Sequence, residues 1–549
     1  MISFRSTISK ANRRLPLQVA AAFLAGSSLI ASLLGIFRDR LFNSLYYLTY
    51  PTGADAYTVA FTVPDFMFII LVSGALSVSF IPVFNQRLAS GNKKSAWELS
   101  TSIINLMALA TLVASVLIII FAEPLVRYVV GPGLDESSRA LAVSMMRVIA
   151  VSPFLFAVAT VITSMQQAVG RFAFFALAPA IYNVGIIIGL VFFTNGINIF
   201  GWQVFEGGIM GVALGVVLGA ILQLLVSTLG LFGMGFDYRF KIYWKNKGFR
   251  QVLRLLPPRS LDQGIDYVNS IAETNLASRM VAGSALAYKQ VMSISYVPIN
   301  LIGVAISTAA FPKMTERMAQ GRPDLFRTEL QAVLRVIIWL ALPVTVVAVI
   351  CRGYIVNFIV NGGDPYMASI LAILGISILF RSVYFISARS FYAQQDTKTP
   401  LYISLFTIAL NITLAVWFTL GLNGGVHGLA WASVIVSIVE VAILFFIMSR
   451  QIKGLFNLPF VHAIGRMVIA SAVMAVITYF LVVAFPLSAD DQRFLDSFPK
   501  FTLIATLSLL SYFLFSYLFK LQEVKPILAR VQRILFKAPE IKDDPRSHS

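Results

Sequence analysis

The chain has 549 residues, of which 58% are hydrophobic and 12% are charged, and its mean hydropathy is +0.82. Soluble domains average roughly 45–50% apolar and about 25% charged residues, so this composition excludes a soluble globular protein and favours a polytopic helical membrane protein. The single cysteine, Cys351, excludes an internal disulfide and a cysteine metal cluster, and the three histidines show no metal-ligand spacing. A net charge of +18 would suit a nucleic acid partner, but its distribution along the chain indicates membrane topology instead.

Thirteen apolar segments, each long enough to cross a bilayer, follow one another along the chain. The first comes after a basic start and has no A-x-A-like cleavage site, so it is predicted to be a transmembrane helix and not a cleaved signal. The segments lie near 17–37, 56–84, 97–122, 138–164, 172–194, 207–232, 284–310, 325–350, 366–393, 400–421, 425–449, 460–485 and 497–519.

The basic residues gather in separate connections, and cytoplasmic loops are the ones that collect Lys and Arg. All the clusters should therefore lie on one side of the membrane, two spans apart. Between Arg254 and Lys313 only 284–310 is plainly apolar, so 257–282, about 26 residues long, is needed as a second crossing. We expect about fourteen spans and two cytoplasmic termini. The clusters contain Arg5, Lys10, Arg13 and Arg14; Arg87, Lys93 and Lys94; Arg171; Arg239, Lys241, Lys245, Lys247, Arg250 and Arg254; Lys313, Arg317, Arg322 and Arg327; Lys398; Arg450 and Lys453; and Lys520, Lys525, Arg530, Arg533 and Lys537.

The predicted seventh span, 257–282, carries charges that a lipid-facing helix would not. Asp262, Asp266, Asn269 and Glu273 are spaced i, i+4, i+7 and i+11, which places them on one helical face. Charges that face lipid are costly, so this face should look into protein or a water-filled cavity. The alternative, an amphipathic helix on the membrane surface, fails the argument from loop charges.

Three short matches indicate an internal repeat. PVFNQRLASG at 82–91 resembles PKMTERMAQG at 312–321, QQAVGRFAFFALAPAIYN at 166–183 resembles QQDTKTPLYISLFTIALN at 394–411, and GGIMGVALGVVLGAILQ at 207–223 resembles GGVHGLAWASVIVSIVE at 424–440. A repeat of six spans keeps its orientation, and transporters built from such parallel repeats bind substrate between the halves. The predicted parts are an N-lobe at 1–236, a basic cytoplasmic linker at 237–256, a C-lobe at 257–452, two further spans at 453–520 and a cytoplasmic tail at 521–549.

The sequence also resembles a known family. LLGIFRDRLF, ADAYTVAFTVPDF, SGALSVSFIPVFNQRL, AFPKM and YAQQDTKTP resemble, in order and spacing, the MurJ/MviN family of the multidrug/oligosaccharidyl-lipid/polysaccharide exporter superfamily. The resemblance implies an all-helical, V-shaped fold of two six-helix lobes plus two C-terminal helices. It also implies a lipid II flippase, which moves the undecaprenyl-pyrophosphate-linked peptidoglycan precursor from the inner to the outer leaflet by alternating access.

The chain departs from the family at positions where well-studied members carry arginines that the resemblance assigns to the pyrophosphate. Ser32, Phe68, Ile69 and Ser293 stand at or near those positions here. This departure leaves two alternatives open, a flippase for another polyprenyl-pyrophosphate-linked oligosaccharide and a cation-coupled multidrug exporter of the same superfamily. A membrane scaffold without transport activity is a third.

The candidate substrate-binding residues are the charged residues of the predicted spans and their ends. Arginine suits a diphosphate because its planar fork binds oxygens in pairs. A helix N-cap is the ordinary alternative for Asp55, an interfacial anchor is the alternative for the group at 38–40, and snorkelling is the alternative for Lys289. The candidates are Arg38, Asp39, Arg40, Asp55, Arg259, Asp262, Asp266, Glu273 and Lys289.

No nucleotide motif or nucleophile constellation is present in the sequence, so we expect a transporter and not an enzyme. No cofactor is expected, although Na⁺ or H⁺ would serve as a coupling ion. The resemblance makes Asp266 and Asn411 candidate Na⁺ ligands, even though Ala415 stands one turn beyond Asn411 where an acid would be expected. The expected partners are lipid II, membrane lipids and other cell-wall synthesis proteins, but no nucleic acid, and the expected location is the bacterial cell membrane.

Overall fold

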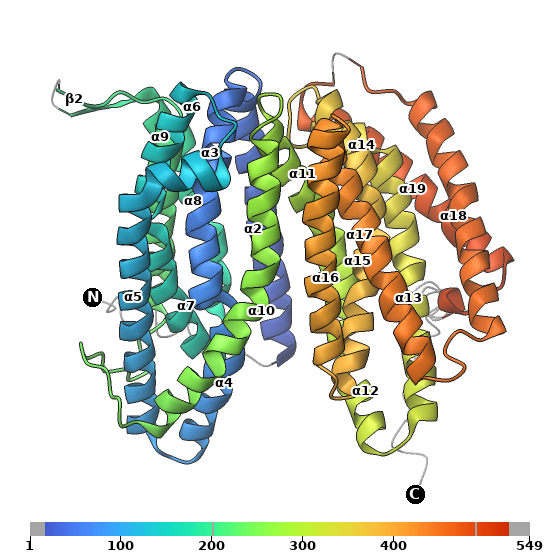
Figure 1. Ribbon diagram of the computed structural model, residues 1–549, viewed down its shortest axis with the longest axis horizontal. Helices are drawn as coiled ribbons and strands as arrows, with labels where there is room; N and C mark the ends of the chain where they lie inside the picture. The colour runs from blue at the N-terminus through green and yellow to red at the C-terminus, as the bar shows by residue number, and fades with distance from the viewer. Residues whose placement is uncertain (1–16, 200–201, 489–490, 526–549) are drawn as a thin grey trace, which may run out of the picture. The chain divides into compact units, whose positions relative to one another are not determined.

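The computed structural model describes residues 17–199, 202–488 and 491–525, and within these ranges it leaves some side chains undescribed, among them those of 257–263, 265 and 266. The described chain is helical apart from a two-stranded antiparallel ribbon (Figure 1). Through residue 229 its elements are α2 (Leu17–Phe42), η1 (Asn43–Tyr47), α3 (Pro51–Phe68), η2 (Ile69–Ser73), α4 (Gly74–Ala89), α5 (Lys93–Pro124), η3 (Leu125–Val130), α6 (Glu136–Ile149), α7 (Ser152–Ala168), α8 (Ala173–Phe192), η4 (Phe193–Asn195), β1 (Ile197–Ile199), β2 (Trp202–Phe205) and α9 (Met210–Leu229).

The second half of the chain is also helical. Its elements are α10 (Lys247–Ala277), α11 (Ser284–Pro298), η5 (Ile299–Val304), α12 (Ala305–Ala319), α13 (Pro323–Ile350), α14 (Arg352–Asn357), α15 (Pro365–Ala393), α16 (Lys398–Val416), η6 (Trp417–Gly421), α17 (Gly425–Gln451), α18 (Leu458–Ala484), α19 (Phe494–Leu518) and η7 (Gln522–Val524).

Twelve helical segments of the described residues are long and apolar enough to cross a membrane, which confirms a multi-pass helical membrane protein. They match twelve of the fourteen predicted spans. The other two predicted spans correspond to α2 and to α10, which are long helices but are not among the twelve. A total of fourteen crossings therefore stays a prediction.

Helix α10 begins earlier than the sequence indicated. The predicted linker ends at residue 256, yet α10 already starts at Lys247 and runs for 31 residues. Asn246 explains this start, because its side-chain oxygen accepts a hydrogen bond from the Phe249 amide at 3.1 Å and so caps the first turn. The final ten residues of the predicted linker are thus part of the helix that contains the predicted seventh span.

Two π-helical segments support the internal repeat. η2 follows α3 and η5 follows α11. Their first residues, Ile69 and Ile299, have the same separation along the chain as Pro82 and Pro312 in the repeated segments. Prolines lie inside the helices around both segments, and π-bulges are among the identifiable causes of bends in helices. The predicted equivalence of spans two and eight therefore extends to their local irregularities.

The described chain divides into two compact units. Of the described residues, the first unit contains 17–199, 202–290, 356–367 and 408–432, and the second contains 291–355, 368–407, 433–488 and 491–525. The first unit includes 257–290 and two short later segments, all of which the sequence assigns to the C-lobe. The lobe boundaries, and the arrangement of the lobes, stay predictions.

The first unit contains a close helix pair, α8 and α9, in which glycines face each other. A Cβ atom on Gly185 would lie 2.2 Å from the Gly219 Cα, and one on Gly189 would lie 2.5 Å from the Gly215 Cα. Small residues four apart let two membrane helices approach closely, so larger side chains at these positions would separate α8 from α9.

The second unit is held by polar contacts inside an apolar core. The Trp339 indole nitrogen of α13 donates to the Ser516 hydroxyl of α19 at 3.1 Å, and Arg335 pairs with Glu523 at 2.6 Å. Both groups of the ion pair are mostly buried, so loss of one partner would leave an uncompensated charge. These contacts fix the last spanning helix and η7 against α13.

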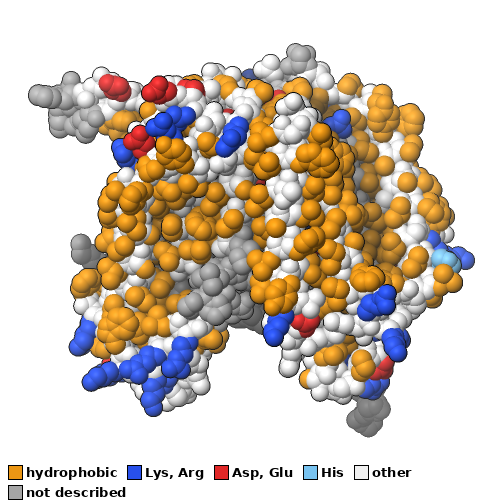
Figure 2. All heavy atoms as spheres, viewed as in Figure 1, with side chains coloured by type: hydrophobic (Ala, Val, Ile, Leu, Met, Phe, Trp, Pro, Cys, Tyr) orange, Lys and Arg blue, Asp and Glu red, His pale blue; other side chains and the backbone are white. Residues whose placement is uncertain are grey.

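The surface has the pattern of a membrane protein. Figure 2 shows hydrophobic side chains over the middle of the helices, and Lys and Arg side chains gathered near the helix ends. On α5, for example, Leu109, Leu112, Leu117 and Ile120 are all exposed. Exposure of so much apolar surface to water would be unfavourable in free energy, whereas contact with lipid tails is favourable.

Two carboxylates in loops outside the spans are held ionised by local donors. Hydrogen bonds from Ser137 and Ser138 lower the pKa of Asp135, which caps α6, to about 2. The Lys500 ammonium, 2.7 Å away, and the Ser488 amide hold the pKa of Asp491 below its usual value. Both carboxylates order connections between helices.

Candidate functional site

An ion pair at the end of α2 is tied to α8. The Arg38 guanidinium donates to the Asp39 carboxylate at 3.0 and 2.7 Å and to the Asn183 side-chain oxygen of α8 at 2.9 Å. The Asn183 amide group then donates to the Ala31 carbonyl of α2 at 3.2 Å. Arg38 and Asp39 are both partly exposed, so the pair has a fixed position and an accessible side.

A second ion pair joins α3 to α11. The Lys289 ammonium lies 4.0 Å from the Asp65 carboxylate and 5.7 Å from the centre of the Phe61 ring. Their side chains are 42% and 39% exposed, respectively, so this pair is long and only half covered. Asp65 also accepts a hydrogen bond from Tyr267 of α10. The Lys289 ammonium therefore lies near both a carboxylate and an aromatic face.

Two tyrosines lie near the charges of both ion pairs. Tyr57 and Tyr182 are each close enough to Arg38 and to Asp65 for the charges to act on their hydroxyl groups. Tyr57 also stacks on Phe42 at 4.8 Å and meets Phe61 edge-on at 4.9 Å. We call Arg38, Asp39, Asp65 and Lys289, with these two tyrosines, the polar cluster.

The polar cluster contains two cations and two anions, so it has no net charge as it stands. Charged side chains within membrane helices are costly and usually mark a binding site or a transport path. A phosphate oxyanion could replace a carboxylate as the partner of a cation, and Lys289 is the more exposed of the two. Lys289 is therefore the best-placed group for an anionic ligand.

Asp55 has a structural role that the sequence did not indicate. It is 3% exposed, and its two carboxylate oxygens accept hydrogen bonds from the amides of Gly283 at 2.7 Å and Leu286 at 3.0 Å. Since α11 begins at Ser284, Asp55 of α3 caps the N-terminus of another helix. The ordinary alternative, a cap on its own helix, does not apply because α3 already begins at Pro51, and a role of Asp55 in substrate binding stays a prediction.

Further hydrogen bonds join the ends of α2 and η1 to later segments of the first unit. Tyr47 donates to Asp364 at 2.6 Å, and Asn43 donates to Gln290 and to the Ile359 carbonyl, both at 2.8 Å. Arg40 donates to the Asn357 carbonyl. Together with the Asp55 cap, we call these contacts the capping junction. They connect the predicted N-lobe with segments of the predicted C-lobe.

The capping junction lies at the opposite end of α10 from the basic connections. Helix α10 starts at Lys247, within the largest basic cluster, and ends at Ala277, shortly before Gly283. Its 31 residues span roughly 46 Å at 1.5 Å per residue. If the basic loops are cytoplasmic, as their charge predicts, the capping junction is at the outer face.

A buried carboxylate on α10 is held by two amides. Glu273 is 7% exposed and accepts hydrogen bonds from Asn269 at 3.0 Å and from Asn411 of α16 at 3.3 Å. Asn411 also donates to the Asn269 oxygen at 2.8 Å. The Asn411 side-chain oxygen is buried and has no hydrogen-bond partner among the described residues. We call Asn269, Glu273 and Asn411 the amide–carboxylate triad.

The predicted site residues thus fall into three groups, while others lie outside the described part. Arg38, Asp39 and Lys289 belong to the polar cluster, Arg40 and Asp55 to the capping junction, and Glu273 and Asn411 to the triad. The side chains of Arg259, Asp262 and Asp266 lie outside the described residues, so their predicted roles stay predictions.

Sequence reasoning missed Asp65 and its neighbours Tyr57 and Tyr182. Asp65 lies in the middle of an apolar run, and a charge in that position was itself a signal of function. The tyrosines carried no such signal, because aromatic residues are common in membrane helices. Among the described residues, no group of three or more His, Cys, Asp or Glu side chains could hold a metal ion.

Comparisons with known proteins agree with this architecture. Residues 46–489 match the family model described as lipid II flippase MurJ. The chain is 25% identical over 522 residues to the probable lipid II flippase MurJ of Bdellovibrio bacteriovorus, covering 92% of this chain and 96% of that protein. It is also 25% identical over 486 residues to the protein of the same name from Thermotoga maritima, covering 87% and 91%.

Solved structures show the same fold. A lipid II flippase MurJ in an inward closed conformation superposes with a TM-score of 0.72 at 23% identity, covering 90% of this chain and 98% of that one. An inward-facing MATE family multidrug resistance transporter of the MOP superfamily has a TM-score of 0.65 at 16% identity, covering 80% and 99%. The family model spans most of the chain, and the chain therefore belongs to the lipid II flippase MurJ family.

Proposed function

We propose that this protein flips lipid II, the undecaprenyl-pyrophosphate-linked peptidoglycan precursor, from the inner to the outer leaflet for cell wall synthesis. The observation that carries the proposal is the polar cluster, in which two partly exposed cations, Arg38 and Lys289, lie beside carboxylates within the membrane helices of a chain of this family. The cluster provides a binding site for the diphosphate of the headgroup, while the lipid tail stays in the bilayer.

Lys289 compensates for a missing arginine in this proposal. Ser293 stands near the place of a family arginine, and Lys289 precedes it by four residues on the continuous helix α11. Residues four apart share a helical face, so Lys289 presents its charge about one turn from that position. The diphosphate oxygens would take the Lys289 ammonium from Asp65, and the Arg38 guanidinium would contribute a second cation.

Transport then requires the capping junction to open. With the basic loops in the cytoplasm, the closed junction seals the outer side while the headgroup enters from the inside. Opening it would expose the Gly283 and Leu286 amides and the Asp55 carboxylate to water, which replaces their hydrogen bonds. The membrane potential can drive the return step, because each charge moved is worth about 2.3 kcal/mol per 100 mV.

The reaction breaks no covalent bond of the substrate, so the protein acts as a transporter and not as an enzyme. The headgroup shifts the equilibrium between the inward-open and outward-open states only if its binding free energy differs between them. A proton or Na⁺ bound at the amide–carboxylate triad is a suitable coupling ion. Glu273 and the unpaired Asn411 oxygen are the oxygen ligands that such a hard cation prefers.

The proposed location is the bacterial cytoplasmic membrane, with both termini in the cytoplasm. The N-terminal basic residues at 5–14 and the tail from 526 onward lie outside the described residues, so loop charge alone supports this orientation. Lipid II and the surrounding lipids are the proposed partners, together with other proteins of cell wall synthesis.

The test is translocation in reconstituted vesicles. The full chain is incorporated into vesicles that carry fluorescent lipid II, and the fraction that becomes accessible on the opposite face is measured over time. We expect translocation, and we expect unlabelled lipid II to compete with it. If a polyprenyl-pyrophosphate lipid with another sugar competes better, the substitutions at Ser32, Phe68, Ile69 and Ser293 have redirected specificity. If vesicles loaded with a cationic dye export the dye but translocate no lipid II, the flippase proposal is wrong and the multidrug-exporter alternative is favoured.

A further inference from the structure

The connection between α9 and α10 is an ordered strap on the surface of α5. Tyr238 donates its hydroxyl to the Asn105 side-chain oxygen at 2.6 Å, and Asn105 donates to the carbonyls of Arg239 and Lys241, both at 3.0 Å. The Tyr243 amide donates to the Ser102 hydroxyl at 2.8 Å. These contacts hold the backbone of residues 238–246, which we call the strap, along the N-terminal half of α5.

The strap presents aromatic and basic side chains outward. Phe240 is 92% exposed and Trp244 is 57% exposed, although the backbone beside them is fixed. Basic residues alternate with them at Arg239, Lys241 and Lys245. Aromatic rings between cations are typical of segments that lie at the level of lipid headgroups, where the rings enter the apolar boundary and the charges stay outside.

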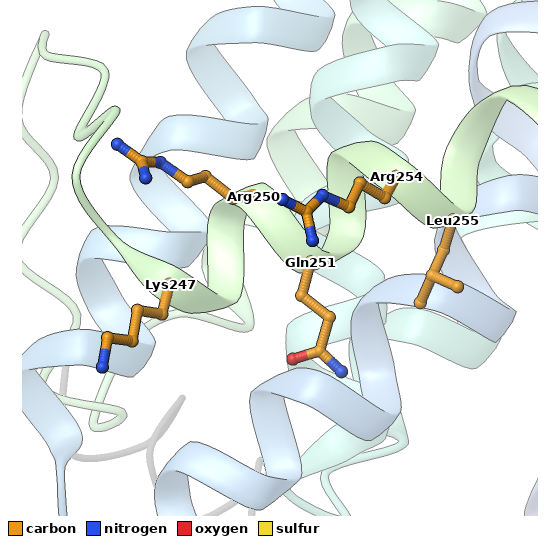
Figure 3. A pocket seen from close by; sticks show the side chains of 5 residues that line it. All are labelled: Lys247, Arg250, Gln251, Arg254 and Leu255. Carbon is orange, nitrogen blue, oxygen red and sulfur yellow. The ribbon is translucent and has the colours of Figure 1, made fainter.

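A basic pocket lies directly after the strap, on the first turns of α10. It has a volume of about 480 Å³ and is lined by Lys247, Arg250, Gln251, Arg254 and Leu255, whose side chains lie on neighbouring turns (Figure 3). None of its three cations takes part in the ion pairs found among the described residues, and Arg250 is oriented by its hydrogen bond to the Trp244 carbonyl at 2.8 Å. Figure 2 shows Lys and Arg side chains gathered at this end of the first unit.

We propose that the strap and this pocket form a binding site for the headgroup of an anionic phospholipid of the surrounding leaflet. The phosphate would be held by Lys247, Arg250 and Arg254, while Phe240 and Trp244 lie at the boundary between headgroups and acyl chains. The charges are complementary, since unpaired cations near the surface attract anionic lipids.

The position of the pocket separates it from the proposed transport site. Arg254 and Tyr267, the α10 residue that contacts Asp65, are 13 residues apart, or roughly 20 Å along the helix. The proposed site is therefore distinct from the polar cluster, and the proposal does not depend on which substrate is transported.

The first test is native mass spectrometry of the full chain in detergent with phosphatidylglycerol or phosphatidylcholine. We expect a preference for phosphatidylglycerol, and we expect the variant Lys247→Gln/Arg250→Gln/Arg254→Gln to lose about tenfold or more in affinity for it. The control Lys313→Gln/Arg317→Gln/Arg322→Gln removes the same charge from another connection. It should change affinity less than twofold, since Lys313 and Arg322 already pair with Glu329 and Asp324. Equal losses in both variants, or none in the pocket variant, would overturn the site.

A third lipid distinguishes the two possible sources of phosphate. If the pocket variant loses affinity for undecaprenyl pyrophosphate but keeps its affinity for phosphatidylglycerol, the pocket belongs to substrate capture and the proposal is wrong. The second measurement is quenching of Trp244 by brominated lipids, taken as the difference between the native chain and Trp244→Phe. Stronger quenching by brominated phosphatidylglycerol than by brominated phosphatidylcholine supports the proposal, and no quenching of the Trp244 component contradicts it.

Discussion

Asp55 and Asp65 lie on the same helix, α3, and their carboxylates have opposite surroundings. Asp55 is 3% exposed and its oxygens accept backbone amides of another helix at 2.7 and 3.0 Å, whereas the Asp65 side chain is 39% exposed and its cationic partner lies 4.0 Å away. A buried carboxylate saturated by backbone donors stabilises one arrangement of helices. A half-covered carboxylate lies beside a cation whose side chain a ligand can also reach. Asp55 thus stabilises one arrangement of the helices, whereas Asp65 belongs to the proposed binding site.

The largest expected effect comes from removing the saturated carboxylate. Asp55→Ala leaves the amides of Gly283 and Leu286 without acceptors in a buried position, which costs about 1–3 kcal/mol for each such group. We expect a lower melting temperature in detergent and a large loss of lipid II translocation. Asp55→Asn keeps one acceptor oxygen and should fall between Ala and the native residue. A native melting temperature in Asp55→Ala would contradict the role of the cap.

Removing the Lys289 cation should affect transport but not stability. Lys289→Ala loses a charge-assisted contact with phosphate worth about 1.5–3 kcal/mol, which corresponds to roughly 10- to 150-fold weaker lipid II binding. The melting temperature should hardly change, because partly exposed ion pairs contribute little to stability. Titration of the purified chain with lipid II measures the affinity, and thermal unfolding measures the melting temperature. Lys289→Arg, which keeps the charge, is the control, and a loss in that variant as large as in Lys289→Ala would count against a simple charge role.

The charge can also be moved along the helix. Lys289→Ala/Ser293→Arg places the cation one turn further along α11, near the position at which the family carries arginine. We expect the double variant to recover most of the roughly tenfold or greater loss of Lys289→Ala. Titration of lipid II against the three proteins measures this. If Ser293→Arg gives no recovery, the two positions do not face the same ligand.

A smaller effect is expected at the amide–carboxylate triad. Glu273→Gln keeps a side chain of the same size and one acceptor for the Asn269 and Asn411 amides, so the fold should be retained. The charge that would bind a proton or Na⁺ is lost. Translocation should therefore fall by a few-fold and no longer respond to a Na⁺ or pH gradient. An unchanged ion response would remove the triad from the coupling proposal.

The smallest predicted effect is a pH dependence in the connection between α18 and α19. The pKa of Asp491 is lowered by Lys500, so its stabilising contribution is present above the ordinary Asp pKa near 4 and is lost as the pH falls through the lowered folded value. Asp491→Asn should cost about 1 kcal/mol at pH 7 and remove this dependence. Thermal unfolding between pH 7 and pH 3 measures it. A variant that keeps the same acid sensitivity as the native chain would exclude this contact as its source.

Most of the fold followed from patterns that the membrane imposes on a sequence. Apolar length indicated twelve helices that the structure also contains, because a bilayer requires spans of about 20 residues. The basic loops predict a further crossing within α10, which is not among these twelve and stays a prediction. The start of α10 at Lys247 was missed, since it depends on a cap by Asn246 within a segment that looked like a charged linker.

The site was less predictable, because it depends on which distant helices meet. The sequence identified Arg38, Asp39 and Lys289 as candidates, but it could not indicate that Lys289 lies beside Asp65. It could not reveal the cap at Asp55 either, since the partners of Asp55 are backbone amides more than two hundred residues away. A sequence shows the chemistry of each side chain. It does not show which backbone amides lie within hydrogen-bond distance, because that depends on how the helices pack.

The most direct test of the account is rescue of bacteria depleted of their own lipid II flippase, with lipid II in the outer leaflet quantified. The native chain, Lys289→Ala and Lys289→Ala/Ser293→Arg are compared at equal membrane levels. We predict that the native chain restores outward lipid II, that Lys289→Ala does not, and that the double variant largely does. If the native chain reaches the membrane and restores no lipid II, or if Lys289→Ala restores it fully, the polar cluster is not the seat of lipid II and the central claim fails.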